Sequence, residues 1–407
     1  MALRSAASDA VYCAPGNAAT AAIAINLAVP ATDADGLARL VRERGIDLTI
    51  LGPEAAVAAG AGDAITSAGG SVFGPSKAAG RIESSKVFAK ELLQEAGVPT
   101  PPFRVFDDAA AAKDYVRGED RAFVVKADGL AKGKGTLVPT TVEETLEAID
   151  TLMVMRAAGA AADRVLLEEP ITGKEVSLLA FVDGERVQPL VPACDYKRAF
   201  DADKGPNTGG MGGYSPVGFF SERDVAAAVN TVFEPVVGRL RERGAPYRGC
   251  LYAGLMVREG RLQVLEFNAR FGDPEAQVVL PRAESDLLPL MAEAARGELS
   301  SKVTWSPRCS VGVVLASSGY PGAYQTGHPI EGLSSLEQDV YAFHAGTAAG
   351  PSGYETAGGR VLTLVAVDDA MAAARARAYR NVERVRFQGM TYRTDIGLRE
   401  VEPAAVA

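Results

Sequence analysis

Glu266 and Asn268 lie two residues apart in a segment that reads as a strand over residues 262–265 and beyond. Because alternate side chains of a strand share one face, the carboxylate and the amide oxygen point the same way. Arg270 continues that face if the strand persists. Mg²⁺ takes hard oxygen ligands and few protein carboxylates, and arginine suits multi-oxygen anions. The spacing predicts a site for a divalent cation and phosphate oxygens, although an edge strand with a polar face has the same pattern.

Lysines precede this segment at two places. Lys126 ends an apolar run over residues 122–125, and a segment rich in glycine and lysine follows at residues 128–135. Glycine lets backbone N–H groups approach phosphates closely, and lysine adds positive charge. Lys86 lies at the start of a helix expected over residues 87–96. Neither a Walker loop nor a dinucleotide fingerprint is present, and a mobile hairpin has the same composition, so both interpretations stay open.

A pair of glutamates follows another apolar run. Glu168 and Glu169 end the run over residues 165–167, and a short loop leads to Glu175. Backbone groups of such a hinge would read an adenine edge, and a carboxylate would hold ribose hydroxyls. A solvated strand end is the alternative interpretation of the two glutamates.

In chain order these four features resemble the ATP-grasp superfamily of carboxylate–amine ligases. Residues 192–198 (PACDYKR), 205–216 (GPNTGGMGGYSP) and 270–275 (RFGDPE) are similar to the signature of phosphoribosylamine–glycine ligases. Shorter runs point the same way: APGN at residues 14–17, GPE at 52–54 and FGPSK at 73–77. The resemblance covers about residues 11–397.

This resemblance implies an α/β fold of the ATP-grasp type, with an N-terminal parallel-sheet domain, a lid subdomain and a small C-terminal domain. The expected domains are residues 1–76, residues 77–299 with a lid at about 98–166, and residues 300–407. The implied reaction joins glycine to 5-phosphoribosylamine through glycyl phosphate, giving glycinamide ribonucleotide, ADP and phosphate, in purine synthesis. The alternatives are another ATP-grasp carboxylate–amine ligase and an inactive ATP-binding homologue.

The resemblance also implies roles for individual residues. Glycine and 5-phosphoribosylamine are the expected substrates beside ATP, with Mg²⁺ or Mn²⁺ as the metal, and the division of contacts between the two substrates stays open. The expected catalytic residues are Lys126, Asp195 and Arg270; the nucleotide-binding residues are Lys86, Lys126, Gly133, Gly135, Glu168, Ile171 and Glu175; the metal ligands are Glu266 and Asn268; and the substrate-binding residues are Asn17, Glu54, Lys197, Asn207, Thr208, Gly209, Gly210 and Asp273.

Composition excludes several other classes. The 407 residues carry a net charge of −9 with no basic block, which disfavours a nucleic-acid partner. The sequence contains no run of 18 apolar residues, so no membrane span is predicted, and no secretory signal is evident. Four scattered cysteines without CxxC spacing predict reduced thiols in a cytoplasmic protein. Only two histidines occur, which disfavours Ser–His hydrolysis and histidine-bound zinc. No obligatory protein partner is evident.

The start of the chain departs from the family pattern. Members begin with a strand, a Gly-Gly-Arg-Glu-His-like loop and a helix, whereas only ten residues precede Val11 here. The alternation that remains predicts strands at 10–13, 48–51 and 72–73 and helices at 35–44 and 57–68, as in a parallel sheet. We therefore expect the N-terminal sheet to lack its first strand and Met1 to be an internal position of a longer protein. We expect the 407-residue chain to express poorly, or to bind ATP without using phosphoribosylamine.

Overall fold

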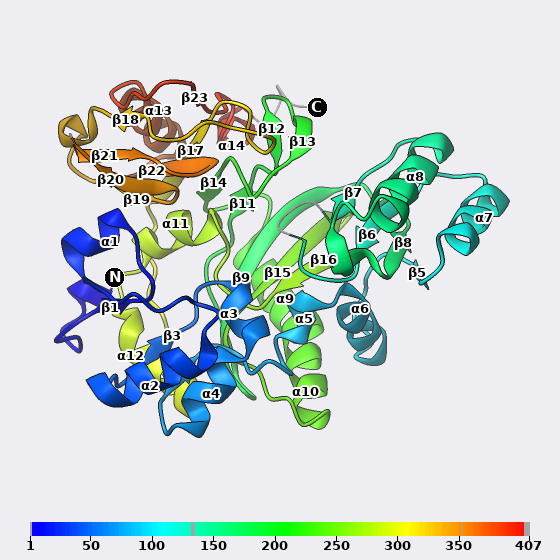
Figure 1. The fold of residues 1–407 in the computed structure, drawn as a ribbon, viewed down its shortest axis with the longest axis horizontal. Coiled ribbons are helices and arrows are strands. Elements are labelled where there is room, and N and C mark those ends of the chain that lie inside the picture. Colours follow the sequence, from blue (N-terminus) through cyan, green and yellow to red (C-terminus); the bar gives the residue numbers. More distant parts are fainter. Residues whose placement is uncertain (1, 132–134, 352, 403–407) are drawn as a thin grey trace.

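The computed structural model describes residues 2–131, 135–351 and 353–402. Its centre is a four-stranded antiparallel sheet in the order β10-β9-β15-β16 (Figure 1). The two inner strands are nearly continuous apolar runs that are buried along most of their length, as expected for strands covered on both faces. The elements of this central part are β9 (Lys174–Asp183), β10 (Val187–Pro189), β15 (Arg248–Arg258) and β16 (Arg261–Asn268), with the helices α5 (Arg81–Ser84), α6 (Lys86–Glu95), α9 (Glu222–Ala228), α10 (Glu234–Glu242), α11 (Glu275–Val279) and α12 (Leu287–Arg296).

The N-terminal segment forms parallel strand pairs, as the alternating pattern predicts. However, β1–β2 and β3–β4 are two separate pairs in the described chain, and residues 2–11 contain one short 3-10 turn and no strand. The helix expected over residues 57–68 is two helices, because Gly60 adopts a left-handed φ of 85° between them. The elements are β1 (Tyr12–Cys13), α1 (Ala18–Ile23), β2 (Ile25–Asn26), α2 (Ala34–Arg44), β3 (Thr49–Ile50), α3 (Glu54–Ala59), α4 (Ala61–Ser67) and β4 (Val72–Phe73).

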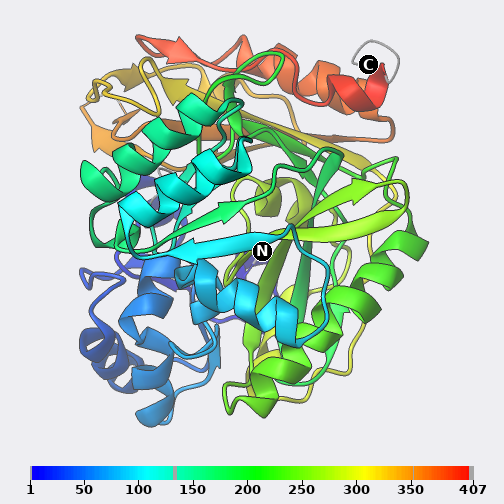
Figure 2. The ribbon, with the colours of Figure 1, turned by 90° about the vertical axis from the view of Figure 1, so that its right-hand side faces the viewer.

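A second antiparallel sheet, in the order β5-β8-β6-β7, carries two α-helices and projects from the body of the molecule in Figure 1. In Figure 2 this unit faces the viewer. It has its own apolar core, which includes Phe123, Val125, Ile149 and Leu167. This unit covers most of the range expected for the lid, and we call it the lid below, although its role as a lid stays a prediction. Its elements are β5 (Phe103–Phe106), α7 (Ala109–Glu119), β6 (Val124–Ala127), β7 (Thr136–Leu137), α8 (Val142–Ile149) and β8 (Val165–Glu168).

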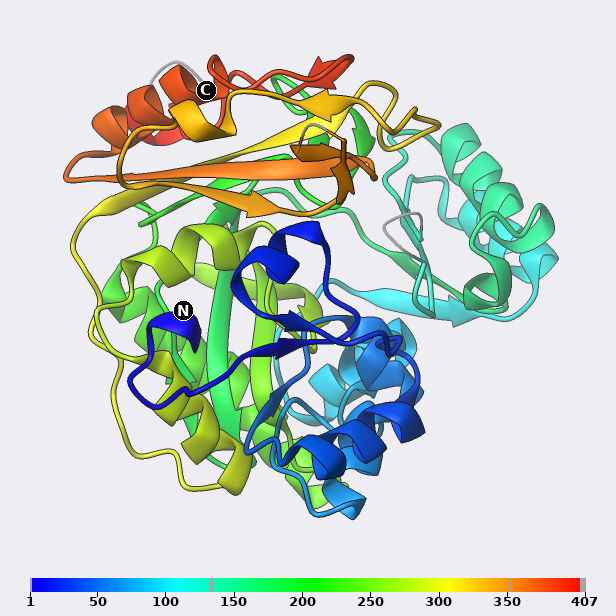
Figure 3. The ribbon, with the colours of Figure 1, turned by 60° about the vertical axis from the view of Figure 1, so that its left-hand side comes forward.

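The C-terminal part is built on a sheet that also recruits strands from the middle of the chain. Strand β14 pairs with β17, so the order is β11-β14-β17-β22-β19, with β23 beside β17. Figure 3 shows this layer over the N-terminal segment, with the lid to one side. The elements are β11 (Cys194–Asp195), β12 (Arg198–Phe200), β13 (Lys204–Asn207), β14 (Gly212–Ser215), β17 (Cys309–Ser317), β18 (Pro329–Ile330), β19 (Val340–His344), β20 (Thr347–Gly350), β21 (Gly353–Thr356), β22 (Arg360–Asp368), α13 (Met371–Val382), β23 (Met390–Thr391) and α14 (Leu398–Val401).

The pairing of β14 with β17 has a consequence for the site. Residues 208–211 of the glycine-rich signature run lie between β13 and β14, and this loop is therefore tied to the C-terminal sheet rather than to the central sheet alone. Among the described residues, no helix is long and apolar enough to cross a membrane.

Candidate functional site

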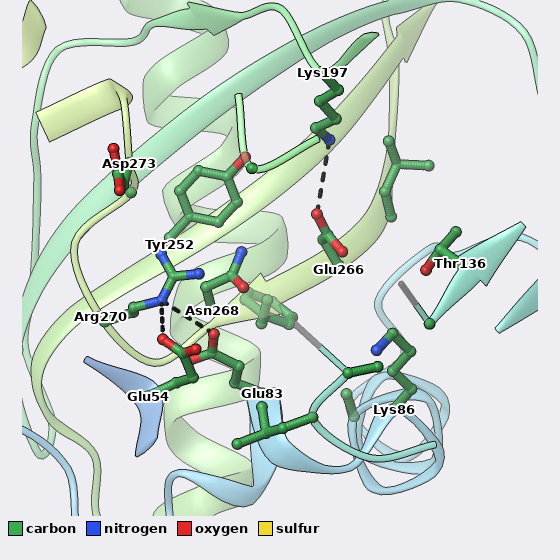
Figure 4. A pocket seen from close by; sticks show the side chains of 18 of the residues that line it. Glu54, Glu83, Lys86, Thr136, Lys197, Tyr252, Glu266, Asn268, Arg270 and Asp273 are labelled. Atoms are coloured by element: carbon green, nitrogen blue, oxygen red, sulfur yellow. Dashed lines mark hydrogen bonds and ion pairs between the residues drawn. The ribbon is translucent and has the colours of Figure 1, made fainter. Parts of the chain in front are cut away.

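A cavity of about 650 Å³ lies where the lid, the central sheet, the N-terminal loops and the C-terminal sheet meet (Figure 4). This volume is in the range of small-molecule sites. Most of the residues singled out from the sequence line it. They are Glu54, Lys86, Lys126, Gly135, Glu168, Asp195, Lys197, Thr208, Gly209, Glu266, Asn268, Arg270 and Asp273.

Glu266 and Asn268 end strand β16 and share its cavity face. Glu266 pairs with Gly254 of β15, and Asn268 pairs with Tyr252. Burial acts to raise the pKa of Glu266, but Lys197 and other nearby cations outweigh it and keep the pKa below its ordinary value. The carboxylate is thus held ionised.

This donor set fits a hard cation. One ionised carboxylate and one amide oxygen point into a polar cavity that is large enough for nucleotide phosphates, and Mg²⁺ commonly uses few protein ligands together with phosphate oxygens. In the described ranges no three side chains of the His, Cys, Asp and Glu types come together in a group that could hold a metal ion.

Arg270 lies beyond the end of β16, because the strand stops at Asn268. Its Nε is 3.1 Å from Oε2 of Glu54 and 3.3 Å from Oε1 of Glu83, as the dashed lines in Figure 4 show. Glu83 also accepts a hydrogen bond from the backbone N–H of Ala269 at 2.7 Å. Burial raises the pKa of Glu83 to about 7, against the opposing effect of Arg270. The guanidinium is therefore held between two carboxylates at the end of the predicted cation-binding strand.

Hydrogen bonds at the N-terminus of helix α6 fix the position of the helix that carries Lys86 and Lys90. Ser85 caps the helix, and Asp128, which follows β6, accepts hydrogen bonds from the Ser85 hydroxyl and from the backbone N–H of Val87, each at 2.8 Å. The side chain that opens the glycine-rich segment is thus fixed to the helix that begins with Lys86. Lys90 lies one turn later on the same face, as an i, i+4 neighbour.

Glu168 contacts two lysines in the wall of the cavity. Its Oε2 is 2.8 Å from Nζ of Lys126, and its Oε1 is 3.1 Å from Nζ of Lys90. The side chains of Glu168, Lys90 and Lys126 are 2%, 4% and 9% exposed. Burial lowers the pKa of Lys90 to about 8, although Glu168 opposes the shift. This carboxylate, expected to contact adenosine, is engaged by two ammonium groups that link the lid sheet to α6.

Asp195 and Lys197 lie on the opposite side of the cavity. Nζ of Lys197 is 3.1 Å from Oε2 of Glu175 and 3.7 Å from Oε1 of Glu266. Burial raises the pKa of Asp195 to about 7, and Glu275 adds to the rise whereas Lys197 opposes it. Burial alone would lower the pKa of Lys197, but the surrounding carboxylates hold it well above its usual value. Lys197 therefore keeps its charge beside the predicted metal ligand.

Several predicted residues do not line the cavity. Asn17 caps α1 and accepts a hydrogen bond from Thr20, and Asn207 belongs to the β12–β13 hairpin. Glu175 meets the site through Lys197, and Gly210 through its carbonyl, while Ile171 lies in the loop after β8. Gly133 lies outside the described residues. The roles expected for these six residues, like those of the residues that line the cavity, stay predictions.

Other cavity residues were missed by the sequence reasoning. Two of them could have been found from helical spacing around Lys86. Lys90 lies four residues after Lys86, and Glu83 lies three residues before Lys86. Tyr320 and Arg360 come from the C-terminal part and carry no local signal, because only the tertiary fold brings them to the cavity. The unforeseen polar residues are Glu83, Lys90, Thr136, Tyr252, Glu275, Tyr320 and Arg360.

Family models match most of the chain. Residues 1–83 match the N domain of phosphoribosylglycinamide synthetase, residues 84–276 its ATP-grasp (A) domain and residues 310–399 its C domain. These ranges differ from the expected boundaries near residues 76 and 299, which stay predictions.

Curated relatives and solved structures agree with these matches. The phosphoribosylamine–glycine ligase of Halalkalibacterium halodurans is 44% identical over 399 residues, covering 98% of this chain and 93% of the relative. The enzyme of that name from Streptomyces coelicolor is 45% identical over 396 residues, covering 96% and 93%.

Among solved structures, phosphoribosylamine–glycine ligase from Thermotoga maritima superposes with a TM-score of 0.84 at 32% identity, covering 95% of this chain and 94% of that one. A biotin carboxylase from Campylobacter jejuni reaches a TM-score of 0.72 at 15% identity, covering 98% and 90%, and shares the fold. The α/β ATP-grasp fold expected from the sequence is confirmed.

Proposed function

The chain belongs to the phosphoribosylamine–glycine ligase family, and from this premise we propose that its central cavity joins glycine to 5-phosphoribosylamine. The resemblance seen in the motifs is confirmed, and the chain is an ATP-dependent carbon–nitrogen ligase of purine biosynthesis. The roles of the individual residues in binding and catalysis are proposals. The observation that carries the proposal is the convergence of Lys86, Lys126, Glu266, Asn268 and Arg270 on one cavity.

The chemical difficulty is that a carboxylate is a poor electrophile. In the proposed reaction a carboxylate oxygen of glycine attacks the γ-phosphorus of ATP, and ADP leaves, which gives glycyl phosphate. The amine of 5-phosphoribosylamine then attacks the acyl carbon, the C–O bond to phosphate breaks, and the nitrogen loses a proton. The products are glycinamide ribonucleotide, ADP and phosphate. Catalysis of this kind depends mainly on positioning and charge neutralisation.

We assign the nucleotide phosphates to the lysine side of the cavity. Lys86 and Lys126 supply positive charge there, and Gly135 ends the segment that would cover the phosphates. Glu168 is proposed to hold Lys126 and Lys90 in position, because both of its oxygens already face ammonium groups. Adenosine contacts by Ile171 and Glu175 stay part of the proposal on the strength of the family resemblance.

Glu266 and Asn268 are proposed to hold Mg²⁺ or Mn²⁺. The ion would neutralise phosphate charge when bound. Arg270, two residues beyond this pair, is proposed to bind the glycine carboxylate or the transferring phosphoryl group, with Glu54 and Glu83 fixing its orientation. Water exclusion by the lid would protect glycyl phosphate from hydrolysis.

We assign the amine acceptor and glycine to the side of the cavity lined by Asp195, Lys197, Thr208, Gly209 and Asp273. Lys197 lies 3.7 Å from Glu266, so acceptor contacts and metal ligands are neighbours, as transfer between them requires. A neutral amine is already nucleophilic, and no strong general base is needed.

The test is an assay of ADP release by the purified chain. ADP and glycinamide ribonucleotide should form in equal amounts only when glycine, 5-phosphoribosylamine, ATP and Mg²⁺ are all present. ADP release with another carboxylate or amine, and none with this pair, would favour a different ATP-grasp ligase. ATP binding without turnover would favour the inactive homologue.

The location and partners are further parts of the proposal. All four cysteines are free, which supports the cytoplasmic location expected from the sequence. Activity without an obligatory protein partner stays part of the proposal.

A further inference from the structure

Arg360 begins strand β22 of the C-terminal sheet and reaches into the cavity wall. Its guanidinium donates to the Asp273 carboxylate, with Nη2 at 2.6 Å from Oδ2 and Nη1 at 3.2 Å from Oδ1. Nη1 also approaches three backbone carbonyls, those of Gly209 at 2.7 Å, Asp273 at 3.2 Å and Gly210 at 3.4 Å. A single side chain thus joins two of the signature runs, those at residues 205–216 and 270–275, to a third part of the chain.

Tyr320 holds the same loop from the other side of the peptide. Its hydroxyl accepts a hydrogen bond from the backbone N–H of Gly209 at 2.9 Å. Both polar groups of Gly209 therefore bind C-terminal side chains. A Cβ at Gly209 would lie 3.1 Å from Cζ of Arg360, and Gly210 adopts a φ of +108° that side chains rarely allow. The glycines let the loop lie directly against the guanidinium.

The loop continues to Lys197. The backbone N–H and the hydroxyl of Thr208 donate to the Lys197 carbonyl at 2.8 and 2.9 Å, and the N–H of Gly210 donates to the Thr208 hydroxyl at 3.0 Å. The ammonium of Lys197 then lies beside Glu266. An unbroken series of contacts leads from Arg360 to the acceptor side of the cavity and on to the predicted metal ligand.

We propose that Arg360, supported by Tyr320, is a positioning residue for the amine-acceptor side of the site. It fixes Asp273 and the loop at residues 208–210, and through Thr208 it sets the place of Lys197. Lysine cannot reproduce this role, because an ammonium lacks the planar fork that serves a carboxylate and several carbonyls together. The inference rests on the proposed function for its kinetic part alone.

The experiment compares Arg360→Lys with Arg308→Lys in the full chain. Arg308 is a matched control because it also donates a hydrogen bond to a backbone carbonyl, that of Val367 at 2.9 Å, and forms an ion pair with a carboxylate, that of Asp369 at 3.2 Å, but does not line the cavity. In Arg360→Lys we expect kcat/KM for 5-phosphoribosylamine to fall by roughly 10²-fold, the usual effect of misplacing a reacting group by about 1 Å. The KM for ATP should change less than about twofold, and Arg308→Lys should match the wild type.

Amide hydrogen exchange gives a readout that does not depend on turnover. Peptides covering residues 207–213 should exchange roughly 2- to 10-fold faster in Arg360→Lys and in Tyr320→Phe, as expected for the loss of one hydrogen bond, and should be unchanged in Arg308→Lys. Faster exchange with no product formed by the wild type would reject the proposed function but support the placement of the loop.

Two results overturn the inference. One is native acceptor kcat/KM in Arg360→Lys with unchanged exchange of the loop. The other is an equal fall in kcat/KM for ATP and for 5-phosphoribosylamine, which would mean that Arg360 stabilises the protein as a whole and does not position the acceptor side in particular.

Discussion

Substitution of Glu168 tests how much the buried ion pairs in the cavity wall contribute to stability. Its carboxylate is the shared partner of Lys90 and Lys126, and all three side chains are almost fully buried. Glu168→Gln keeps the shape of the side chain and removes the charge, which leaves two buried ammonium groups without a carboxylate. Glu169→Gln is the matched control, since Glu169 is the next residue but pairs with Arg121 at the surface, where the two side chains are 35% and 42% exposed.

The expected magnitude follows from burial. Breaking a buried pair by removing one partner typically costs about 3–5 kcal/mol. Lys90 can avoid its share of this cost by becoming neutral. Its pKa is already about 8, so at pH 7.5 it can lose its proton for less than about 1 kcal/mol. Lys126 must then carry most of the penalty. We therefore expect the lower end of the range, about 3 kcal/mol for Glu168→Gln. The exposed pair of Glu169 should be worth about 0–1 kcal/mol.

Urea denaturation followed by circular dichroism measures these differences, and pH adds an independent check. Between about pH 8 and the ordinary lysine pKa, the folded protein binds fewer protons at Lys90 than the unfolded chain, so stability gains from this group as pH rises. In Glu168→Gln that gain should begin at lower pH, because the opposing carboxylate is gone. A loss below about 1 kcal/mol, or one no larger than that of Glu169→Gln, would refute the reasoning.

Two further predictions concern the cation-binding strand and its neighbour. Glu266→Ala and Asn268→Ala should each lower turnover by roughly 10²- to 10³-fold with folding largely intact, as for the loss of one transition-state electrostatic contact, and near-native turnover at limiting Mg²⁺ would contradict the assignment. Burial raises the pKa of Glu83 to about 7, so the folded state binds more protons than the unfolded chain above about pH 4.5. The stability of the wild type relative to Glu83→Gln should therefore fall by about 3 kcal/mol as pH rises from about 4.5 to about 7. A flat difference in unfolding free energy across that range would count against it.

Local patterns in the sequence predicted much of this site. The spacing of Glu266 and Asn268 placed both on one strand face, and the helix expected at residues 87–96 begins at Lys86. The break at Gly60 was missed although the sequence carries its signal, since a glycine at the end of a helix commonly takes the left-handed conformation.

What escaped prediction depends on pairing between distant segments. Glu168 meets Lys126 because β6 and β8 are neighbouring antiparallel strands, and no local pattern states that register. Arg360 and Tyr320 follow the signature runs by many residues, and only the pairing of β14 with β17 brings their sheet to the loop. Residue types and spacing predict which groups are available, whereas strand order decides which of them meet.

The attachment of the loop at residues 208–210 to the C-terminal sheet also matters for the construction of chimeric enzymes. A cut between α12 and β17 looks permissive, since the intervening segment contains no helix or strand. Yet a C-terminal part grafted from a relative would have to bring an arginine and a tyrosine that match Asp273 and Gly209 of the host. Recombination at that junction should therefore give chains that fold and bind nucleotide but differ in how well they use the amine, according to whether these two contacts were inherited together.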